Sequence, residues 1–416
     1  MDDARIGWKV REQMALFSGK VSSGLPKVAR RLVREVLYGV QARGSVRLSE
    51  IARCLGERTG MKKVIERLGR QLGRRGLGRE VASNLLALAA PRIDEETLLV
   101  LDPTDLSKPY ARKMQYLTRV RDGSKGELSD GYWCLEILAA RRSSAELIPL
   151  FQELYSQDAP DFVSENHQIL QAIETVSEAV EGRGIWVIDR GGDRRKILKP
   201  LLSNGQQFIV RQRGDRHLIY RRSKKLVSEI AESCRCRYRE VVVRQDGASE
   251  KIYHLRMGAT TVHFAGSHRD LSLVVVKGFG QKPLLLLTTL KVKRSRKSLW
   301  RVVEGYLARW RVEETIRFIK QSYHLEDIRL LRYQRLRNMV SLVLAAAYFA
   351  AVHLGKQARL RIFLQHLTQA AQRIYGVPEF RLYAIADGIK QVLFGSRRGI
   401  GPPSRPPNEQ NLCLPL

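Results

Sequence analysis

Residues 306–320, with the sequence YLARWRVEETIRFIK, place a stripe of polar groups at helical spacing. The segment has no Gly or Pro and is rich in residues that favour helices. At about 100° per residue, one narrow side of this helix holds four polar residues: Tyr306, Arg309, Glu313 and Lys320. Another side is apolar and is expected to face a core: Ala308, Val312, Ile316 and Ile319.

A carboxylate flanked by Arg and Lys is also typical of a solvated helix face that carries charge pairs. The composition of the stripe argues against that reading. Tyr306 lies in it, and Trp310 and Arg317 flank it, whereas an exposed face needs no aromatic residues. In addition, two apolar segments upstream each end in an Asp. The segment is therefore a candidate for one wall of an active site.

The two upstream Asp residues are Asp102, which follows TLLVL, and Asp189, which follows IWVI. Open α/β sheets place their chemistry at the carboxyl ends of such apolar strands. Taken alone, Asp102 before Pro103 is equally consistent with a turn. Three further acids compete with it, of which the last two precede Gly and are interpreted as turns: Asp105, Asp122 and Asp130.

The spacing Y-x2-R-x3-E-x6-K at Tyr306, Arg309, Glu313 and Lys320 matches the YREK signature. With Asp102 and Asp189 in order before it, the chain resembles bacterial insertion-sequence transposases of the DDE, cut-and-paste type. The resemblance covers the chain to about residue 375. It implies an α/β fold with a ribonuclease H-like catalytic core, on which Asp102, Asp189 and Glu313 form a metal-binding catalytic triad.

Strand and helix patterns agree with that core. Three antiparallel strands, a helix, a strand, a helix and a strand are expected between residues 97 and 211, which is the ribonuclease H-like order. Glu313 follows Asp189 by 124 residues, far more than one crossover needs. We therefore expect a β-rich insertion between them.

The predicted division of the chain has five parts. They are a helical, helix-turn-helix-like DNA-binding domain (1–90), the first part of the core (95–215), the β-rich insertion (216–282), the second part of the core with the Glu helix (283–375), and a C-terminal segment with a mobile tail (376–416). Residues 1–90 hold 19 Lys and Arg against 8 Asp and Glu, which suits phosphate contact. An ordinary helical bundle has a similar pattern.

The formal net charge of +31 indicates a polyanionic partner, with nucleic acid ahead of a membrane surface or a scattered basic surface. Five scattered cysteines fit a reducing compartment, and the N-terminus has no apolar signal segment. Together with these features, the resemblance implies a bacterial cytoplasmic protein associated with the nucleoid. The apolar run over residues 339–354 is short for a membrane span and is expected to be a buried helix.

Three carboxylates at one sheet edge repel each other unless cations lie between them, and their oxygens favour Mg²⁺, with Mn²⁺ as a substitute. Two such ions suit displacement at a phosphodiester. The resemblance implies that Tyr306, Arg309 and Lys320 contact the element's DNA end, and that Trp310 or Trp300 stacks on a flipped base. Further DNA contacts are expected from basic residues around the helix: Lys291, Lys293, Arg294 and Arg317.

The sequence thus predicts a transposase that binds the terminal inverted repeats of its element, cleaves the ends and joins the 3′ ends to target DNA. A homodimer in a synaptic complex is expected, without a membrane or a small-molecule cofactor. Two alternatives stay open: another ribonuclease H-like nuclease, and a decayed or repurposed transposase that only binds DNA.

Overall fold

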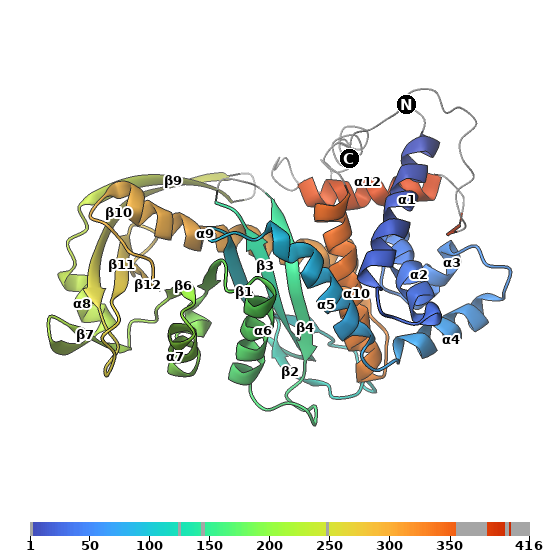
Figure 1. Cartoon of the computed structure of the whole chain (residues 1–416), viewed down its shortest axis with the longest axis horizontal. Helices are drawn as coiled ribbons and strands as arrows, with labels where there is room; N and C mark the ends of the chain where they lie inside the picture. Colours follow the sequence, from blue (N-terminus) through green and yellow to red (C-terminus); the bar gives the residue numbers. More distant parts are fainter. Residues whose placement is uncertain are drawn as a thin grey trace.

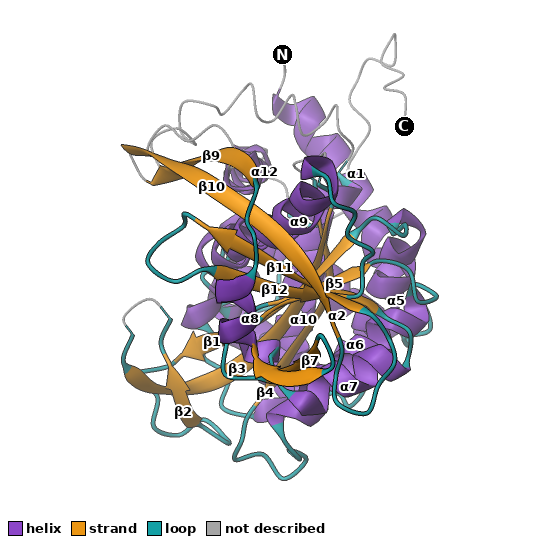
Figure 2. Ribbon diagram, turned by 90° about the vertical axis from the view of Figure 1, so that its left-hand side faces the viewer, coloured by secondary structure: helices purple, strands orange, loops and turns teal. Residues whose placement is uncertain are grey.

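The computed structural model describes residues 3–123, 126–142, 146–246, 249–354, 381–395 and 399–400. Within these ranges the protein is mixed α/β, with a large twisted sheet between helices (Figures 1 and 2). The strand order is β2-β3-β1-β5-β6-β12-β11-β10-β9, and β4 also pairs with β3. A helical region precedes the sheet in the chain.

The first half of the sheet has the strand order expected from the sequence. Antiparallel pairing joins β4, β3 and β1, and parallel pairing joins β1, β5 and β6. The strands are β1 (Leu98–Ser107), β2 (Thr118–Arg121), β3 (Leu128–Ala140), β4 (Leu147–Tyr155), β5 (Ile185–Ile188) and β6 (Gln207–Arg211). Helices α6 (Glu165–Ala179) and α7 (Arg195–Ser203) make the connections around β5.

The predicted insertion over residues 216–282 does not form a separate sheet. β12 (Leu284–Thr288) pairs with β6, and β11 (Leu271–Lys277), β10 (Ser249–Val262) and β9 (Tyr238–Asp246) continue outward from it. The core sheet is therefore extended, and β9 and β10 form a long ribbon at its end (Figure 2). Only a small hairpin stands off the sheet, made of β7 (His217–Tyr220) and β8 (Ser223–Leu226) and followed by α8 (Val227–Ser233).

Alternating side chains give the sheet two buried faces, as expected for strands covered on both sides. One face packs beneath the long helix α9 (Arg296–Ser322) and includes Leu98, Val100, Ile185, Val187 and Ile209. The opposite face joins the main core and includes Leu99, Leu101, Trp186, Ile188, Phe208 and Val210. The strands around the first two Asp residues are thus fixed from both sides.

Helix α9 begins at Arg296, before the segment 306–320 that the sequence predicts to be helical. The Oγ of Ser295 accepts a hydrogen bond from the backbone N–H of Ser298 and caps the helix there. Arg301 consequently lies within the helix. The helix then runs along the sheet and contacts strands from β1 to β12 (Figure 1).

The N-terminal helices share a core with the C-terminal half of the chain. They are α1 (Asp3–Val21), α2 (Lys27–Arg43), α3 (Leu48–Cys54), α4 (Met61–Leu72) and α5 (Leu77–Ala89), with a 3₁₀ turn at Ala90–Arg92. Helix α10 (Tyr333–Tyr348) packs against α2, α4, α5 and β4. The predicted DNA-binding region over residues 1–90 is therefore built into the protein and does not stand apart from it (Figure 1).

One buried side chain on α10 ties these helices together. The Oδ1 of Asn338 accepts from the backbone N–H of Gly78, and its Nδ2 donates to the carbonyls of Leu72 and Arg74. A Cβ at Gly78 would lie 2.8 Å from Asn338 Oδ1. Only glycine allows this approach, so α5 and α10 are held at a fixed crossing.

The apolar run predicted to be a buried helix lies in α10 and the π-helical turn Phe349–His353 that follows it. In the described part of the chain, one helix, Tyr333–His353, is long and apolar enough to cross a membrane, and 89% of its apolar window is buried inside the protein. Its apolar side chains pack in the main core.

The C-terminal segment begins with a packed helix. Helix α12 (Arg381–Gly395) packs against α1, α2 and α9. Ile400 also packs on the main core. Residues 355–380 and most of the tail that the sequence predicts to be mobile lie outside the described residues.

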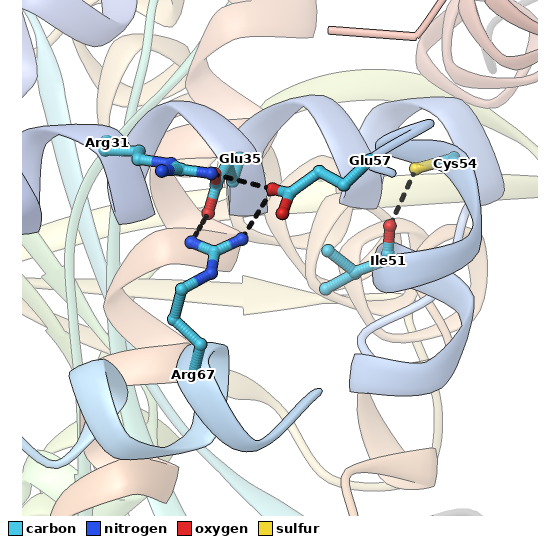
Figure 3. A network of polar contacts seen from close by, with 6 residues as sticks. All are labelled: Arg31, Glu35, Ile51, Cys54, Glu57 and Arg67. Atoms are coloured by element: carbon cyan, nitrogen blue, oxygen red, sulfur yellow. Dashed lines mark hydrogen bonds and ion pairs between the residues drawn. The ribbon is translucent and has the colours of Figure 1, made fainter. Parts of the chain in front are cut away.

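A network of four charged residues joins α2, the turn after α3, and α4 (Figure 3). The carboxylate of Glu35, 1% exposed, lies 2.6 Å from Arg31 Nε and 2.7 Å from Arg67 Nη1. Glu57 accepts from the same two arginines, at 2.9 and 2.6 Å. Arg31 and Arg67 belong to the basic excess that suggested DNA binding, but here they neutralise a buried acid.

We predict that Glu35→Ala lowers the free energy of unfolding by about 1–3 kcal/mol, because Arg67 loses its buried partner while Glu57 still compensates in part. Urea unfolding of purified protein measures this change. Glu50→Ala is the control, since Glu50 pairs only with the half-exposed Arg53, and it should cost about 0.5 kcal/mol or less. Equal losses in the two variants would contradict a structural role of the network.

Candidate active site

The two Asp residues predicted to be catalytic lie at the same edge of the sheet. Leu101 of β1 is in register with Ile188 of β5, and the two strands are parallel. Asp189 follows the end of β5, whereas Asp102 lies within β1, directly after the stretch of β1 that pairs with β5, so both Asp residues lie where the parallel pairing ends. Helix α9 crosses both strands and carries Glu313.

Arg309 of α9 links the acids. Its Nη1 lies 2.5 Å from Glu313 Oε1 and 3.5 Å from Asp102 Oδ1. The residue is only 7% exposed, and its buried Nε has no hydrogen-bond partner. Although burial opposes it, the surrounding acids raise the pKa of Arg309, so the guanidinium stays charged. The predicted stripe on α9 therefore faces inward, toward the sheet edge.

Asp102 and Asp189 differ in their electrostatic environments. Burial raises the pKa of Asp102 to about 7, and Glu313 and Asp189 add to the effect while Arg309 and Lys320 oppose it. At Asp189 burial is outweighed by the charge of Arg309, by the backbone N–H of Arg190 and by the hydroxyl of Tyr306, and its pKa is lowered. Without additional positive charge, Asp102 is thus the acid that holds a proton near neutral pH.

The Tyr306 side chain contacts another residue of the site, Asp189. Its hydroxyl donates to Asp189 Oδ1 at 2.8 Å, and its side chain is 2% exposed. Burial, followed by the charge of Asp189, raises the pKa of Tyr306 to about 12. Arg211 of β6 lies 3.6 Å from the same carboxylate oxygen. The predicted contact of Tyr306 with DNA phosphate is therefore replaced in this structure by a contact that orients Asp189.

Lys320, one of the predicted phosphate ligands, points to an acid that we interpreted only as a competitor of Asp102. Its Nζ lies 3.5 Å from Asp105 Oδ1, which also accepts from the backbone N–H of Gly123 at 3.2 Å. Asp105 is 6% exposed. The end of β1 thus presents two acids to α9: Asp102 toward Arg309 and Asp105 toward Lys320.

The predicted base-stacking residues lie in different surroundings. Trp310 meets the ring of Phe279 edge-on at 5.8 Å, and the guanidinium of Arg244, from β9, lies 4.4 Å from the centre of the Trp310 ring. Trp300 is partly buried against the core beneath α9. Trp310 therefore connects α9 to the β9–β10 ribbon, next to Arg309.

The remaining predicted DNA contacts are at the surface. Lys291, Lys293 and Arg294 are exposed in the segment before α9, and Arg317 is exposed on α9. The hydroxyl of Tyr238 donates to the Arg294 carbonyl at 2.7 Å, and Glu240 binds Arg296 through both carboxylate oxygens. Strand β9 thus holds the basic segment in place.

The carboxylate oxygens of Asp102, Asp189 and Glu313 are of the kind that a hard divalent cation binds. As the side chains stand, no three His, Cys, Asp or Glu residues within the described ranges encircle a common point where an ion would bind. Arg309 lies between the acids and neutralises them instead. Ion binding at this site therefore requires the guanidinium to move aside.

A family model described as "Transposase DDE domain" matches residues 148–349. This part of the chain is therefore similar to transposase DDE domains. A domain of that family implies a ribonuclease H-like core, in agreement with the order of β4, β3, β1, β5 and β6. Asp189 and Glu313 lie within the matched residues, and Asp102 lies before them.

Among solved structures, the chain is similar to that described as "Cryo-EM structure of piggyBac transposase synaptic complex with hairpin DNA". The identity is 11%, the match covers 98% of this chain and 86% of that chain, and the TM-score is 0.46. No curated protein matches the chain.

Sequence reasoning missed three contributors to this site. Arg211 was part of a predicted strand, Arg244 part of the predicted insertion, and Asp105 was set aside in favour of Asp102. The position of Asp105, three residues after Asp102 in an apolar context, was a usable signal. The other two were not visible, because their approach depends on how strands β6 and β9 pair.

We predict opposite effects on stability for two substitutions measured in EDTA. Because the pKa of Asp102 is raised in the folded protein, Asp102 contributes stability at low pH, and this stability is lost as the pH rises toward 7. Asp102→Asn should therefore stabilise the protein at pH 8 by about 1–3 kcal/mol. The lowered pKa of Asp189 means that its carboxylate stabilises the protein at neutral pH and that this stability is lost as the pH falls, so Asp189→Asn should destabilise the protein at pH 8. Chemical unfolding at pH 5 and pH 8 measures both. The same sign for the two variants at pH 8 would contradict this electrostatic assignment.

Proposed function

We propose that this protein is a metal-dependent DNA transposase whose catalytic carboxylates are Asp102, Asp189 and Glu313. The observation that carries the proposal is that Arg309 of α9 lies against Asp102 and Glu313, while Asp189 follows β5, the strand that pairs with β1 up to Leu101. The transposase DDE domain over residues 148–349 supports the class of reaction. DNA is the proposed partner, supported by the net charge of +31.

The proposed chemistry is displacement at a phosphodiester. Two divalent cations, Mg²⁺ or Mn²⁺, held by the three carboxylates would activate the attacking hydroxyl and stabilise the leaving oxygen. Tyr306 keeps one oxygen of Asp189 in place, and Arg211 supports the same carboxylate. Arg309 and Lys320, once their acids are neutralised, are placed to bind the phosphates on either side of the reacting bond.

The finer proposal follows the YREK resemblance. The protein would act in the bacterial cytoplasm on an insertion sequence, bind its terminal inverted repeats, release the 3′ ends and join them to target DNA. Because two ends have to be held together, the active form would be a DNA-bound homodimer or a larger assembly. Trp310, next to Arg309, is the better placed of the two tryptophans to stack on an unpaired base, provided that Arg244 gives way.

We predict that the protein cleaves a labelled duplex carrying its element's end in Mg²⁺ and not in EDTA. Glu313→Gln and Asp189→Asn should each lower the cleavage rate by at least about 100-fold, because each removes a charged oxygen ligand. DNA affinity, measured by gel shift, should stay within a few-fold of wild type. Glu304→Gln, on the same helix and outside the carboxylate cluster, is the matched control and should cleave normally.

The result also separates the alternatives. Binding without cleavage in Mg²⁺ or Mn²⁺ would favour a repurposed protein that only binds DNA. Metal-dependent cleavage without any joining of 3′ ends to a target would favour another nuclease of the same core. Loss of DNA binding together with cleavage in the acidic variants would contradict the proposed roles.

We further predict a steep fall of DNA affinity with salt. Each phosphate contact contributes to the slope of log affinity against log salt concentration, so a protein with six or more contacts should lose about 1,000-fold between 50 and 200 mM salt. A fluorescence anisotropy titration over that range measures the slope. Replacing Lys291, Lys293 and Arg294 together by Gln should reduce the slope by about two to three. An unchanged slope would exclude the segment before α9 from the interface.

A further inference from the structure

Directly opposite Asp102, on the neighbouring strand, lies a buried acid that the mechanism above does not use. Glu136 of β3 is the register partner of Asp102 in the antiparallel pair. Leu138 and Ala140 of the same strand belong to the core beneath α9, and alternation places Glu136 on that face as well. Its side chain is 0% exposed.

The polar contacts of Glu136 are incomplete. Gln152 Nε2 donates to Glu136 Oε1 at 2.7 Å, while Glu136 Oε2 and Gln152 Oε1 are both buried without a hydrogen-bond partner in the described structure. The weakly donating thiol of Cys134 lies beside the carboxyl group. A buried carboxyl group with one unsatisfied oxygen costs folding free energy, and an apolar residue of similar size would cost less. Packing alone therefore does not explain this residue.

The charges around Glu136 are those of the active site. Burial raises its pKa to about 7, the ammonium group of Lys320 opposes this shift, and Asp102 adds to it. The ammonium group of Lys320 lies 3.5 Å from Asp105 Oδ1, and its charge acts on Asp102 and Glu136 without a direct ion pair to either in the described residues.

We propose that Glu136 is a positioning residue of the active site, which acts on Asp102 from the neighbouring strand and adds negative charge behind it without contacting DNA. This inference rests on the proposed function. The additional negative charge strengthens the attraction of the site for a cation at Asp102.

The test uses Glu136→Gln, which keeps the shape of the side chain and removes its charge. The matched control is Glu153→Gln, because Glu153 is next to Gln152 on β4 and binds Arg337 at 2.8 Å, away from the carboxylates. The full-length proteins are compared for Mn²⁺ affinity by electron paramagnetic resonance, for thermal stability in EDTA, and for DNA affinity and cleavage rate.

The expected result for Glu136→Gln is a roughly 10-fold weaker Mn²⁺ affinity and a cleavage rate lower by about 10- to 100-fold, the range found when groups that support metal ligands are removed. DNA affinity should be unchanged, and the melting temperature should be equal to or higher than that of wild type, because an incompletely bonded buried charge is removed. Glu153→Gln should bind Mn²⁺ and cleave DNA like wild type.

A double-mutant cycle tests the connection to Asp102. If Glu136 acts through Asp102, Glu136→Gln combined with Asp102→Asn should weaken Mn²⁺ binding no more than Asp102→Asn alone. Additive losses of Mn²⁺ affinity, or a melting temperature that falls together with activity, would show a merely structural role and overturn the proposal.

Mn²⁺ affinity also separates this proposal from the proposed function. Wild-type binding that is lost in Glu313→Gln but unchanged in Glu136→Gln would overturn the role of Glu136 alone. A wild-type protein that neither binds Mn²⁺ nor cleaves DNA would overturn both.

Discussion

The balance of charge between one guanidinium and three carboxylates governs this site. Asp102, Asp189 and Glu313 would repel each other at the edge of the sheet, and Arg309 is the group that lets them stay close together. The balance is incomplete, because Asp102 still has a strongly raised pKa and Glu136 lies behind it. Under the proposed function, this imbalance is what would favour a divalent cation at the site.

The architecture holds this arrangement in place through α9. The helix lies along one face of the sheet, so its register against β1 and β5 determines which residues face the two Asp side chains. Its C-terminal part reaches the main core through Phe318 and Ile319, where α10 and the N-terminal helices meet. Asn338 and the Glu35 network then fix those helices relative to one another. The N-terminal helices and the sheet edge that carries Asp102 and Asp189 are therefore parts of one packed structure.

Short-range patterns explain what the sequence could predict. Continuous apolar runs identified the strands that lead to Asp102 and Asp189, although β1 continues past Asp102 to Ser107, and helical spacing placed Arg309 and Glu313 on one side of a helix. Pairing between distant segments was not predictable in the same way. The extension of the sheet by β9–β12 depends on the contact of β12 with β6, and Glu136 reaches Asp102 only through the register of β3. Polar residues within apolar strands, such as Glu136 and Asp105, are the signals that local patterns leave unexplained.

The structure also limits what can be concluded from a large positive charge. Several arginines form ion pairs with acids of the protein itself: Arg31 and Arg67 with Glu35, Arg216 with Asp193, and Arg337 with Glu153 and Asp161. These arginines can bind phosphate only if their ion pairs with the acids are broken. Lys291, Lys293 and Arg294 are different, since they are exposed on a segment that β9 holds at the start of α9. Because the same helix carries Glu313, DNA bound by this segment would be guided along α9 toward the carboxylates.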